Sequence, residues 1–172
     1  MNLFDIFKNN SKELTSKDIQ KLKEETDFNQ KEIKKSHKKF CALDKDKKGY
    51  VSINDLVSIP EVENNPLRYH IAQCMNGNRE NEEITFDSFI QVIDMFKNNK
   101  VEEQYKFLFG LFDFDKDGKI SDMDMLINFK LLLGNSLNEQ QIKDIVDKTI
   151  NEYSEKKGYI EYNDFVKILN ET

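Results

Sequence analysis

The hydrophobic and polar positions follow a unit that occurs four times along the chain, and each unit reads as an amphipathic helix, a polar loop and a second apolar helix. Each loop ends in one β-branched residue, and these residues are Val51, Ile84, Ile120 and Ile160. A single apolar residue at that place lets two loops pair through a short β-bridge. The pattern therefore predicts an all-α protein whose four helix-loop-helix units pair into two lobes, each joined by a short two-stranded β-bridge.

Cap signals and helical periodicity place the individual helices. Asn29 and Glu32 form a capping-box-like pair at the start of the helix that leads into the first loop. We expect further helices over about 65–75 and 86–96. The leader LTSKDIQKLKEET, residues 14–26, predicts an additional helix before the first unit.

These elements define the expected domain organisation. We predict an N-terminal extension with the additional helix over residues 1–28 and a first pair of units over 29–96. The short polar stretch KNNK, residues 97–100, is the expected linker. A second pair of units over 101–172 completes the chain.

The sharpest chemical signal is the loop DFDKDGKISDMD, residues 113–124. Acids stand at loop positions one, three and five, and Gly118 at position six permits the left-handed turn that such a loop needs. Calcium prefers an oxygen cage of this kind. The expected ligands are Asp113, Asp115, Asp117, the backbone carbonyl of Lys119, Ser121 and Asp124. The loop therefore predicts one calcium site of the EF-hand type.

One residue of this loop departs from the usual pattern. Position twelve is Asp124, where a glutamate normally reaches the ion with both carboxylate oxygens. Aspartate is one methylene shorter and is expected to coordinate through a single oxygen. We therefore expect reduced selectivity for calcium, so that magnesium competes for the site.

The first loop, DKDKKGYVSIND at residues 44–55, keeps part of the same outline. Position five is Lys48, and a protonated lysine has no lone pair to give to a metal ion. The neighbouring lysines also oppose a divalent cation. The candidate ligands here are Asp44, Asp46, Tyr50, Ser52 and Asp55. We expect metal binding at this loop to be weak or absent.

The other two loops are degenerate. The second, at about residues 77–88, lacks acids at positions one and three and ends in Ser88. The fourth, at about residues 153–164, has Tyr153 at position one. We expect both loops to be metal-free, because apolar helix faces and the β-bridge can hold such a unit together without an ion.

Composition narrows the class of protein. Hydrophobic residues make up 38%, charged residues 34%, and the formal net charge is -6. No apolar run reaches the roughly 18 residues of a membrane span, and the first residues lack the features of a secretion signal. Position 2 is Asn2, whereas N-myristoylation needs glycine. We therefore expect a soluble, cytoplasmic protein without a lipid anchor. We also expect no nucleic-acid partner, since the lysines of KKSHKKF lie between acids and an apolar helix face.

The cysteine and histidine residues do not indicate a disulfide, a zinc site or a catalytic site. We interpret Cys41 and Cys74 as forming no CxxC pair and as having no histidine at ligand spacing. Neither a disulfide framework nor a zinc site is therefore expected. His37 and His70 are interpreted as ordinary surface or partly buried side chains. No Ser-His-Asp or Cys-His set and no phosphate-binding glycine loop is found, which argues against an enzyme.

Three strings resemble calcineurin B, namely IPEVENNPL at 59–67, FDFDKDGKIS at 112–121 and LLLGNSLNEQQIKDIVDKTI at 131–150. The segment over residues 22–45 also resembles the calcineurin B homologous proteins. This resemblance implies a non-catalytic, calcium-binding regulatory subunit that binds an amphipathic helix of a calcineurin A-like serine/threonine phosphatase catalytic subunit. Two alternatives stay open. One is a module bound to another client, such as a sodium-proton exchanger or a myosin, and the other is a stand-alone calcium sensor.

Overall fold

The structure is a computed structural model that describes residues 13–77, 81–154 and 158–171. The first part of the predicted N-terminal extension lies outside the described residues. So do three residues of loop two and three residues of loop four. None of the described helices has the length and apolar content needed to cross a membrane.

The chain divides into two compact units. The first unit comprises Met1–Asn64 and Met75–Lys100, and the second comprises Asn65–Cys74 and Val101–Thr172. The predicted boundaries place residues 65–74 with the first pair of helix-loop-helix units. In the structure this segment belongs to the second unit instead.

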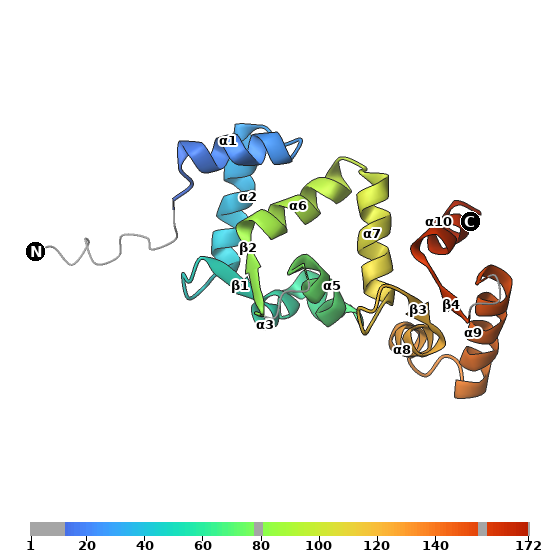
Figure 1. Cartoon of the computed structure of the whole chain (residues 1–172). Helices are drawn as coiled ribbons and strands as arrows, with labels where there is room; N and C mark the ends of the chain where they lie inside the picture. Colours follow the sequence, from blue (N-terminus) through green and yellow to red (C-terminus); the bar gives the residue numbers. More distant parts are fainter. Residues whose placement is uncertain (1–12, 78–80, 155–157, 172) are drawn as a thin grey trace, which may run out of the picture. The chain divides into compact units, whose positions relative to one another are not determined.

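The first unit contains α1, α2, β1, α3, α4, β2 and α6 (Figure 1). Their bounds are α1 (Ser16–Glu25), α2 (Gln30–Leu43), β1 (Tyr50–Ser52), α3 (Ile53–Val57), α4 (Pro60–Glu63), β2 (Glu83–Thr85) and α6 (Phe86–Lys97). The second unit contains most of α5, together with α7, β3, α8, α9, β4 and α10. Their bounds are α5 (Arg68–Met75), α7 (Val101–Phe112), β3 (Ile120–Ser121), α8 (Asp122–Leu133), α9 (Glu139–Tyr153), β4 (Tyr159–Ile160) and α10 (Tyr162–Glu171).

The four β-branched markers pair as the repeat predicts. Val51 of β1 lies opposite Ile84 of β2, and Ile120 of β3 lies opposite Ile160 of β4, both in antiparallel register. All four side chains are almost completely buried. The all-α fold with two short two-stranded bridges is therefore confirmed.

Helix starts also follow the sequence signals. The Asn29 side chain accepts hydrogen bonds from the backbone amides of Lys31 and Glu32, and the Glu32 carboxylate accepts one from the Asn29 amide. This reciprocal arrangement is the predicted capping box of α2. The expected helix in the leader is α1, and Thr15 and Asp18 form its own capping box.

The core of the first unit gathers apolar faces from α1, α2 and α6. Figure 1 shows α1 lying across the start of α2. The Phe40 ring packs against the rings of Phe86 and Phe89, each with centroids 5.4 Å apart. Leu22 of α1 is also buried. Since a buried side chain of this size contributes about 1.5–3 kcal/mol, α1 is an integral part of this unit.

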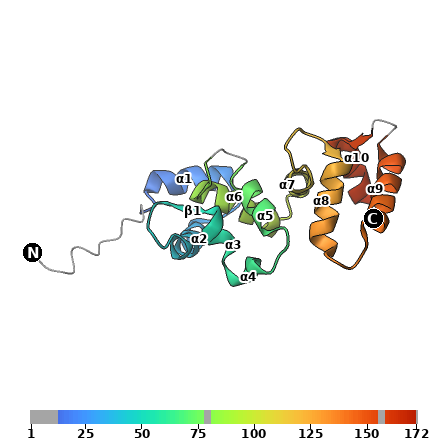
Figure 2. The ribbon, with the colours of Figure 1, turned by 90° about the horizontal axis from the view of Figure 1, so that it is seen from below.

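The core of the second unit lies among α7, α8, α9 and α10, and Figure 2 shows α8 and α9 side by side. Phe109 and Phe165 meet edge to face with centroids 5.6 Å apart. The buried residues of this core are Phe109, Ile120, Met125, Ile142, Val146, Ile150, Ile160 and Phe165. A layer of partly buried apolar side chains, among them Leu108, Phe129 and Leu133, surrounds this core.

A buried ion pair fixes the end of α6. The Asp94 carboxylate is 2% exposed, and its Oδ1 accepts hydrogen bonds from the Asp27 amide at 3.0 Å and the Asn98 side chain at 2.7 Å. The Lys100 ammonium lies 2.5 Å from the second oxygen. The predicted linker at residues 97–100 is thus tied back to the helix before it.

Replacing Asp94 with alanine is expected to reduce the free energy of unfolding by about 3 kcal/mol, because it removes the buried acceptor shared by the Asp27 amide, the Asn98 side chain and the Lys100 ammonium. Urea denaturation followed by far-UV circular dichroism measures the loss. The matched control is Asp87→Ala, which removes the exposed pair with Lys21 and should leave the urea midpoint nearly unchanged. Equal shifts for the two variants would contradict the role given to Asp94.

Candidate metal centre

The loop at residues 113–124 joins α7 to β3 and α8. Its first residue, Asp113, follows the last turn of α7, and the Asp113 amide donates to the Phe109 carbonyl at 2.9 Å. Lys116 and Gly118 have positive φ angles of 63° and 86°. These two left-handed residues fold the chain back on itself, and glycine at the second of them avoids the strain that a side chain would add.

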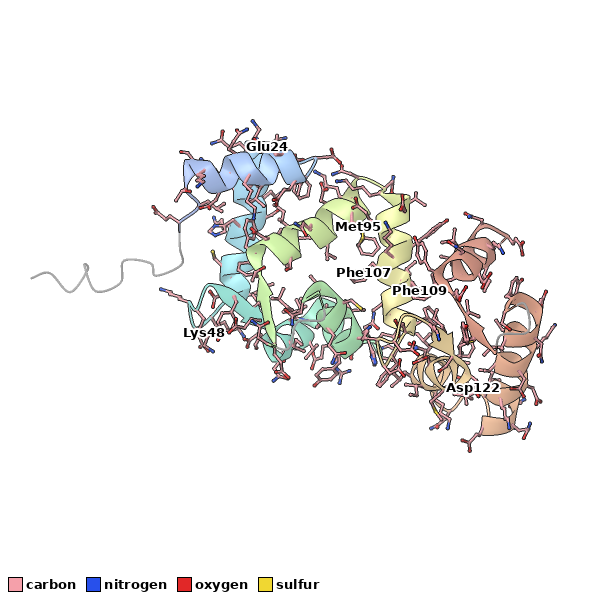
Figure 3. The ribbon with its side chains drawn as sticks, viewed as in Figure 1. Glu24, Lys48, Met95, Phe107, Phe109 and Asp122 are labelled. Carbon is pink, nitrogen blue, oxygen red and sulfur yellow. The ribbon has the colours of Figure 1, made fainter. Side chains whose placement is uncertain are left out.

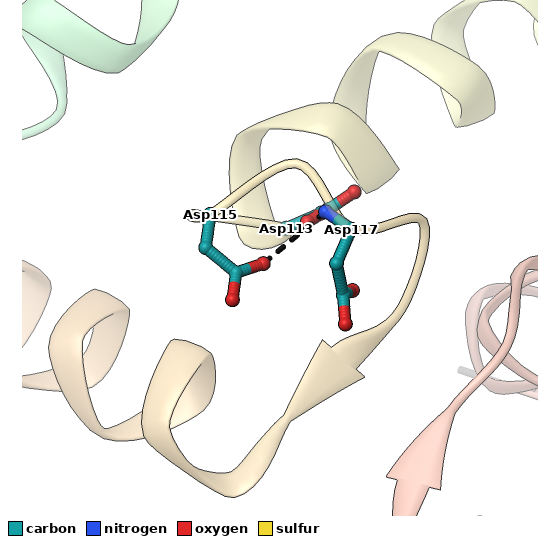
Figure 4. Close-up of side chains that lie close together, drawn as sticks. All are labelled: Asp113, Asp115 and Asp117. Carbon is teal, nitrogen blue, oxygen red and sulfur yellow. Dashed lines mark hydrogen bonds between the residues drawn. The ribbon is translucent and has the colours of Figure 1, made fainter.

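Three carboxylates converge on this loop. Asp113, Asp115 and Asp117 each offer one oxygen, and these oxygens lie within 4.8 Å of one another. Figure 4 shows the three side chains, with the hydrogen bond from the Asp117 amide to the Asp115 carboxylate as a dashed line. The Lys119 amide in turn donates to the Asp117 carboxylate at 2.9 Å. In the described part of the chain, no other group of three or more His, Cys, Asp or Glu side chains gathers in this way.

The Asp113 carboxylate carries the clearest sign of a cation site. Its side chain is 5% exposed, and its Oδ2 accepts the Gly118 amide at 3.0 Å. Its Oδ1 is buried without a hydrogen-bond donor. Burial raises the pKa of this carboxyl group, with partial compensation from the Gly118 amide. A buried carboxylate oxygen without a donor, next to two further carboxylates, suits a hard divalent cation.

Asp124 and Ser121 play a different part from the three clustered acids. The Asp124 Oδ1 accepts the Phe114 amide at 3.0 Å. Its Oδ2 accepts the Ser121 amide at 2.8 Å and the Ser121 hydroxyl at 2.6 Å. Both residues therefore form the capping box of α8, and Asp124 is not one of the three acids whose oxygens converge. Oδ1 accepts a single hydrogen bond, so it is the oxygen of Asp124 that could serve as a ligand.

The loop at residues 44–55 has nearly the same backbone but a different charge arrangement. Lys47 and Gly49 have positive φ angles of 56° and 85° at the same loop positions. Each Asp44 oxygen accepts one hydrogen bond, from the amides of Lys48 and Gly49 at 2.9 and 2.7 Å. The Lys48 ammonium lies 2.7 Å from the Asp46 carboxylate. Figure 3 shows Lys48 on this loop.

The remaining candidate ligands of this loop are also used within the protein. The Ser52 hydroxyl donates to the Asp55 carboxylate at 2.6 Å, and Ser52 caps α3. Tyr50 lies in β1 opposite Thr85. The structure therefore gives a physical reason to expect weak or absent binding here, because the Lys48 ammonium already pairs with the Asp46 carboxylate.

The two degenerate loops are described only in part. Residues 78–80 and 155–157 lie outside the described residues, so their predicted lack of metal stays a prediction. In loop four, Asp164 is 5% exposed, and the Lys167 ammonium lies 3.3 Å from its Oδ1.

The sequence predicted a helix over about residues 65–75 but did not indicate that this helix, α5, contacts the metal loop. The His70 ring of α5 packs on the Phe114 ring with centroids 4.6 Å apart. The Lys116 ammonium donates to the Gly110 carbonyl and to the Cys74 sulfur, the latter at 3.8 Å. Phe114 and Lys116, at loop positions two and four, are held by these contacts, while the carboxylates at positions one, three and five converge. No motif could reveal this, since these two positions are not ligands in the metal pattern.

The helix-loop-helix units, their paired β-bridges and the acidic loop together define an EF-hand protein. Comparison with known proteins refines that class. The chain is 33% identical to the type 1 calcineurin B of Dictyostelium discoideum over 158 residues, which cover 91% of this chain and 87% of the relative. It is 35% identical to the calcineurin B of Naegleria gruberi over 164 residues, covering 94% and 92%. It is 33% identical to the calcineurin B of Candida glabrata over 159 residues, covering 91% and 90%.

The chain therefore belongs to the calcineurin B family. No family model matches the chain. The likeness to the relatives extends over nearly all of the sequence, so it includes both units and the metal loop at residues 113–124. The family resemblance inferred from three short strings is confirmed.

Proposed function

We propose that this chain is a calcium-binding, non-catalytic regulatory subunit that binds an amphipathic helix of a calcineurin A-like serine/threonine phosphatase catalytic subunit. The observation that carries the proposal is the similarity over about nine-tenths of the chain to proteins named calcineurin B. The convergence of three carboxylates at Asp113, Asp115 and Asp117 supports calcium as the ion.

Exposed apolar residues on α8 support helix binding. Leu131 and Leu132, near the end of α8, are 37% and 44% exposed, and Phe129 and Leu133 of the same helix are partly buried against the core. Most apolar side chains of this size are more deeply buried in a folded domain. An amphipathic partner helix could cover such a surface by laying its apolar face along it.

Titration of the purified chain with a peptide of the catalytic subunit's amphipathic helix tests this proposal. We expect binding in calcium and also in chelator, because apolar burial rather than the ion supplies most of the affinity. Leu132→Glu should weaken binding at least about tenfold, since it would bury a charge. Asn151→Glu adds the same charge at an exposed position of α9 and serves as the control.

Two outcomes would count against the proposal. Stronger binding to a helix of a sodium-proton exchanger or a myosin would favour a different client. Binding that disappears completely in chelator would favour a calcium sensor over a permanently bound subunit.

We further propose that the loop at residues 113–124 is the main ion site and that magnesium competes there. The short Asp124 side chain and its hydrogen bonds to Phe114 and Ser121 support this. The loop at residues 44–55 is then a weak site or none, and the two degenerate loops act as structural units.

Asp124→Glu is expected to raise calcium affinity about tenfold and to raise the ratio of calcium to magnesium affinity, because the longer side chain can reach the ion with both oxygens. Isothermal titration calorimetry with each ion measures both effects. Asp122→Glu makes the same change at a neighbouring exposed position and should alter neither value. Unchanged calcium affinity in Asp124→Glu would remove the argument about ion selectivity.

A further inference from the structure

Both histidines and both cysteines of the chain stand in pairs four residues apart. His37 and Cys41 lie in α2, and His70 and Cys74 lie in α5. On a helix, residues four positions apart project from the same face. The sequence interpretation held that neither cysteine stands beside a ligand-spaced histidine, and on this spacing it was wrong.

In the first unit, the two side chains of α2 are in contact. The Cys41 sulfur lies 3.7 Å from Nδ1 and 3.6 Å from Nε2 of His37. With zinc bonds of about 2.3 Å to sulfur and about 2.0 Å to nitrogen, a tetrahedral angle separates the two ligand atoms by about 3.5 Å. The observed separations match that value. Because the sulfur is almost equidistant from the two nitrogens, a turn of the imidazole ring is needed to direct one lone pair toward a shared ion.

A cavity of about 190 Å³ opens beside this pair. Its lining includes His37 and Cys41 together with the carboxylates of Asp18, Asp44 and Asp87 and the ammonium of Lys21. Lys21 pairs with Asp87 at 2.7 Å, so Asp18 and Asp44 supply the negative charge of this lining, which favours a cation. A second hollow beside His37 and Cys41 is lined by Glu13, Lys34 and Lys38, so the negative charge is confined to the side of the first cavity. The space also admits the water molecules that would complete a coordination shell with only two protein ligands.

We propose that His37 and Cys41 form a binding site for a thiophilic divalent cation of the zinc type. The ion binds the cysteine as thiolate and one imidazole nitrogen, and water fills the other positions. Binding releases the thiol proton to solvent, so one proton leaves for each ion bound. This site uses soft sulfur and nitrogen ligands and is separate from the oxygen ligands of Asp113, Asp115 and Asp117. It does not depend on the proposed function.

The pair on α5 provides an internal control. The Cys74 sulfur contacts the Lys116 ammonium at 3.8 Å, which opposes a second cation at that place. Burial also raises the pKa of the Cys74 thiol, so that the thiolate needed by a metal is harder to form. The chain thus holds two pairs of the same spacing, of which only the pair on α2 meets the conditions for binding.

The test is a titration of the full chain with Cd²⁺ in the presence of excess calcium, which keeps the oxygen site filled. Cadmium bound to a thiolate absorbs in the ultraviolet by charge transfer, and an ion bound only to oxygen does not. We expect one equivalent of cadmium to produce this band in the unmodified chain and in Cys74→Ser. Cys41→Ser should lose the band, and His37→Gln should weaken binding at least about tenfold.

Far-UV circular dichroism confirms that each variant is folded before it is compared. In the unmodified chain, zinc should also slow alkylation of Cys41 by iodoacetamide at least about tenfold, as measured by peptide mass. Three results would overturn the proposal. They are a band that persists in Cys41→Ser, a band lost in Cys74→Ser, and an affinity that His37→Gln leaves unchanged.

Discussion

Asp113→Ala is expected to lower calcium affinity by at least about 100-fold, which removes measurable binding at the main site. Asp113 supplies the buried oxygen that has no donor, and it stands among the three convergent acids. Its loss leaves two exposed carboxylates, Asp115 and Asp117, which are hydrated without the ion. Isothermal titration calorimetry and the count of bound calcium by atomic absorption measure the effect.

Asp122→Asn is the control for this prediction. It removes the same unit of charge from the same loop, but Asp122 is exposed and bonds only to the next backbone amide among the contacts described. Figure 3 shows Asp122 at the start of α8. The variant should bind calcium nearly as well as the unmodified chain. If both variants lost affinity equally, general charge rather than coordination would explain calcium binding.

Lys48→Asp is expected to create a second calcium site in the loop at residues 44–55. The loop already has left-handed residues at the same two positions as the main site, so its backbone has the required shape. The substitution removes the ammonium that lies 2.7 Å from Asp46 and places a carboxylate at loop position five. We expect the affinity of this loop for calcium to rise at least about 100-fold and the stoichiometry to rise from one ion to two.

The matched control is Lys47→Asp. It changes the net charge by the same amount one residue earlier, at loop position four, which is not a ligand position. This variant should still bind one ion. A stoichiometry that stays at one in Lys48→Asp would show that the lysine is not what prevents binding in this loop.

Much of the fold could be predicted from the sequence because its signals are local and repeated. Val51, Ile84, Ile120 and Ile160 mark the bridges, since each is a β-branched apolar residue at the corresponding place in its loop. Caps such as that at Asn29 involve residues three positions apart, so they can be read directly from the chain.

The packing of α5 could not be predicted in the same way. His70 and Cys74 contact the metal loop across more than forty positions of sequence, and a four-residue spacing alone does not say which partner a helix face will meet. The segment 65–74 consequently lies in the second unit, although the repeat alone assigns it to the first pair.

The candidate site was predicted by residue type but not by role. The acids at positions one, three and five follow from the motif, and the structure brings them together. The motif could not reveal that Asp124 bonds to the Phe114 amide or that Lys48 pairs with Asp46. Both depend on side-chain conformations that the order of residues leaves undetermined.

Native mass spectrometry of the complex purified from its natural source tests the central claim most directly. We predict one copy of this chain bound to a serine/threonine phosphatase catalytic chain, with at least one calcium or magnesium ion. The two chains should stay together after chelation, when the ion has been removed. Recovery of the chain alone, or with a partner that is not a phosphatase, would contradict the proposed function.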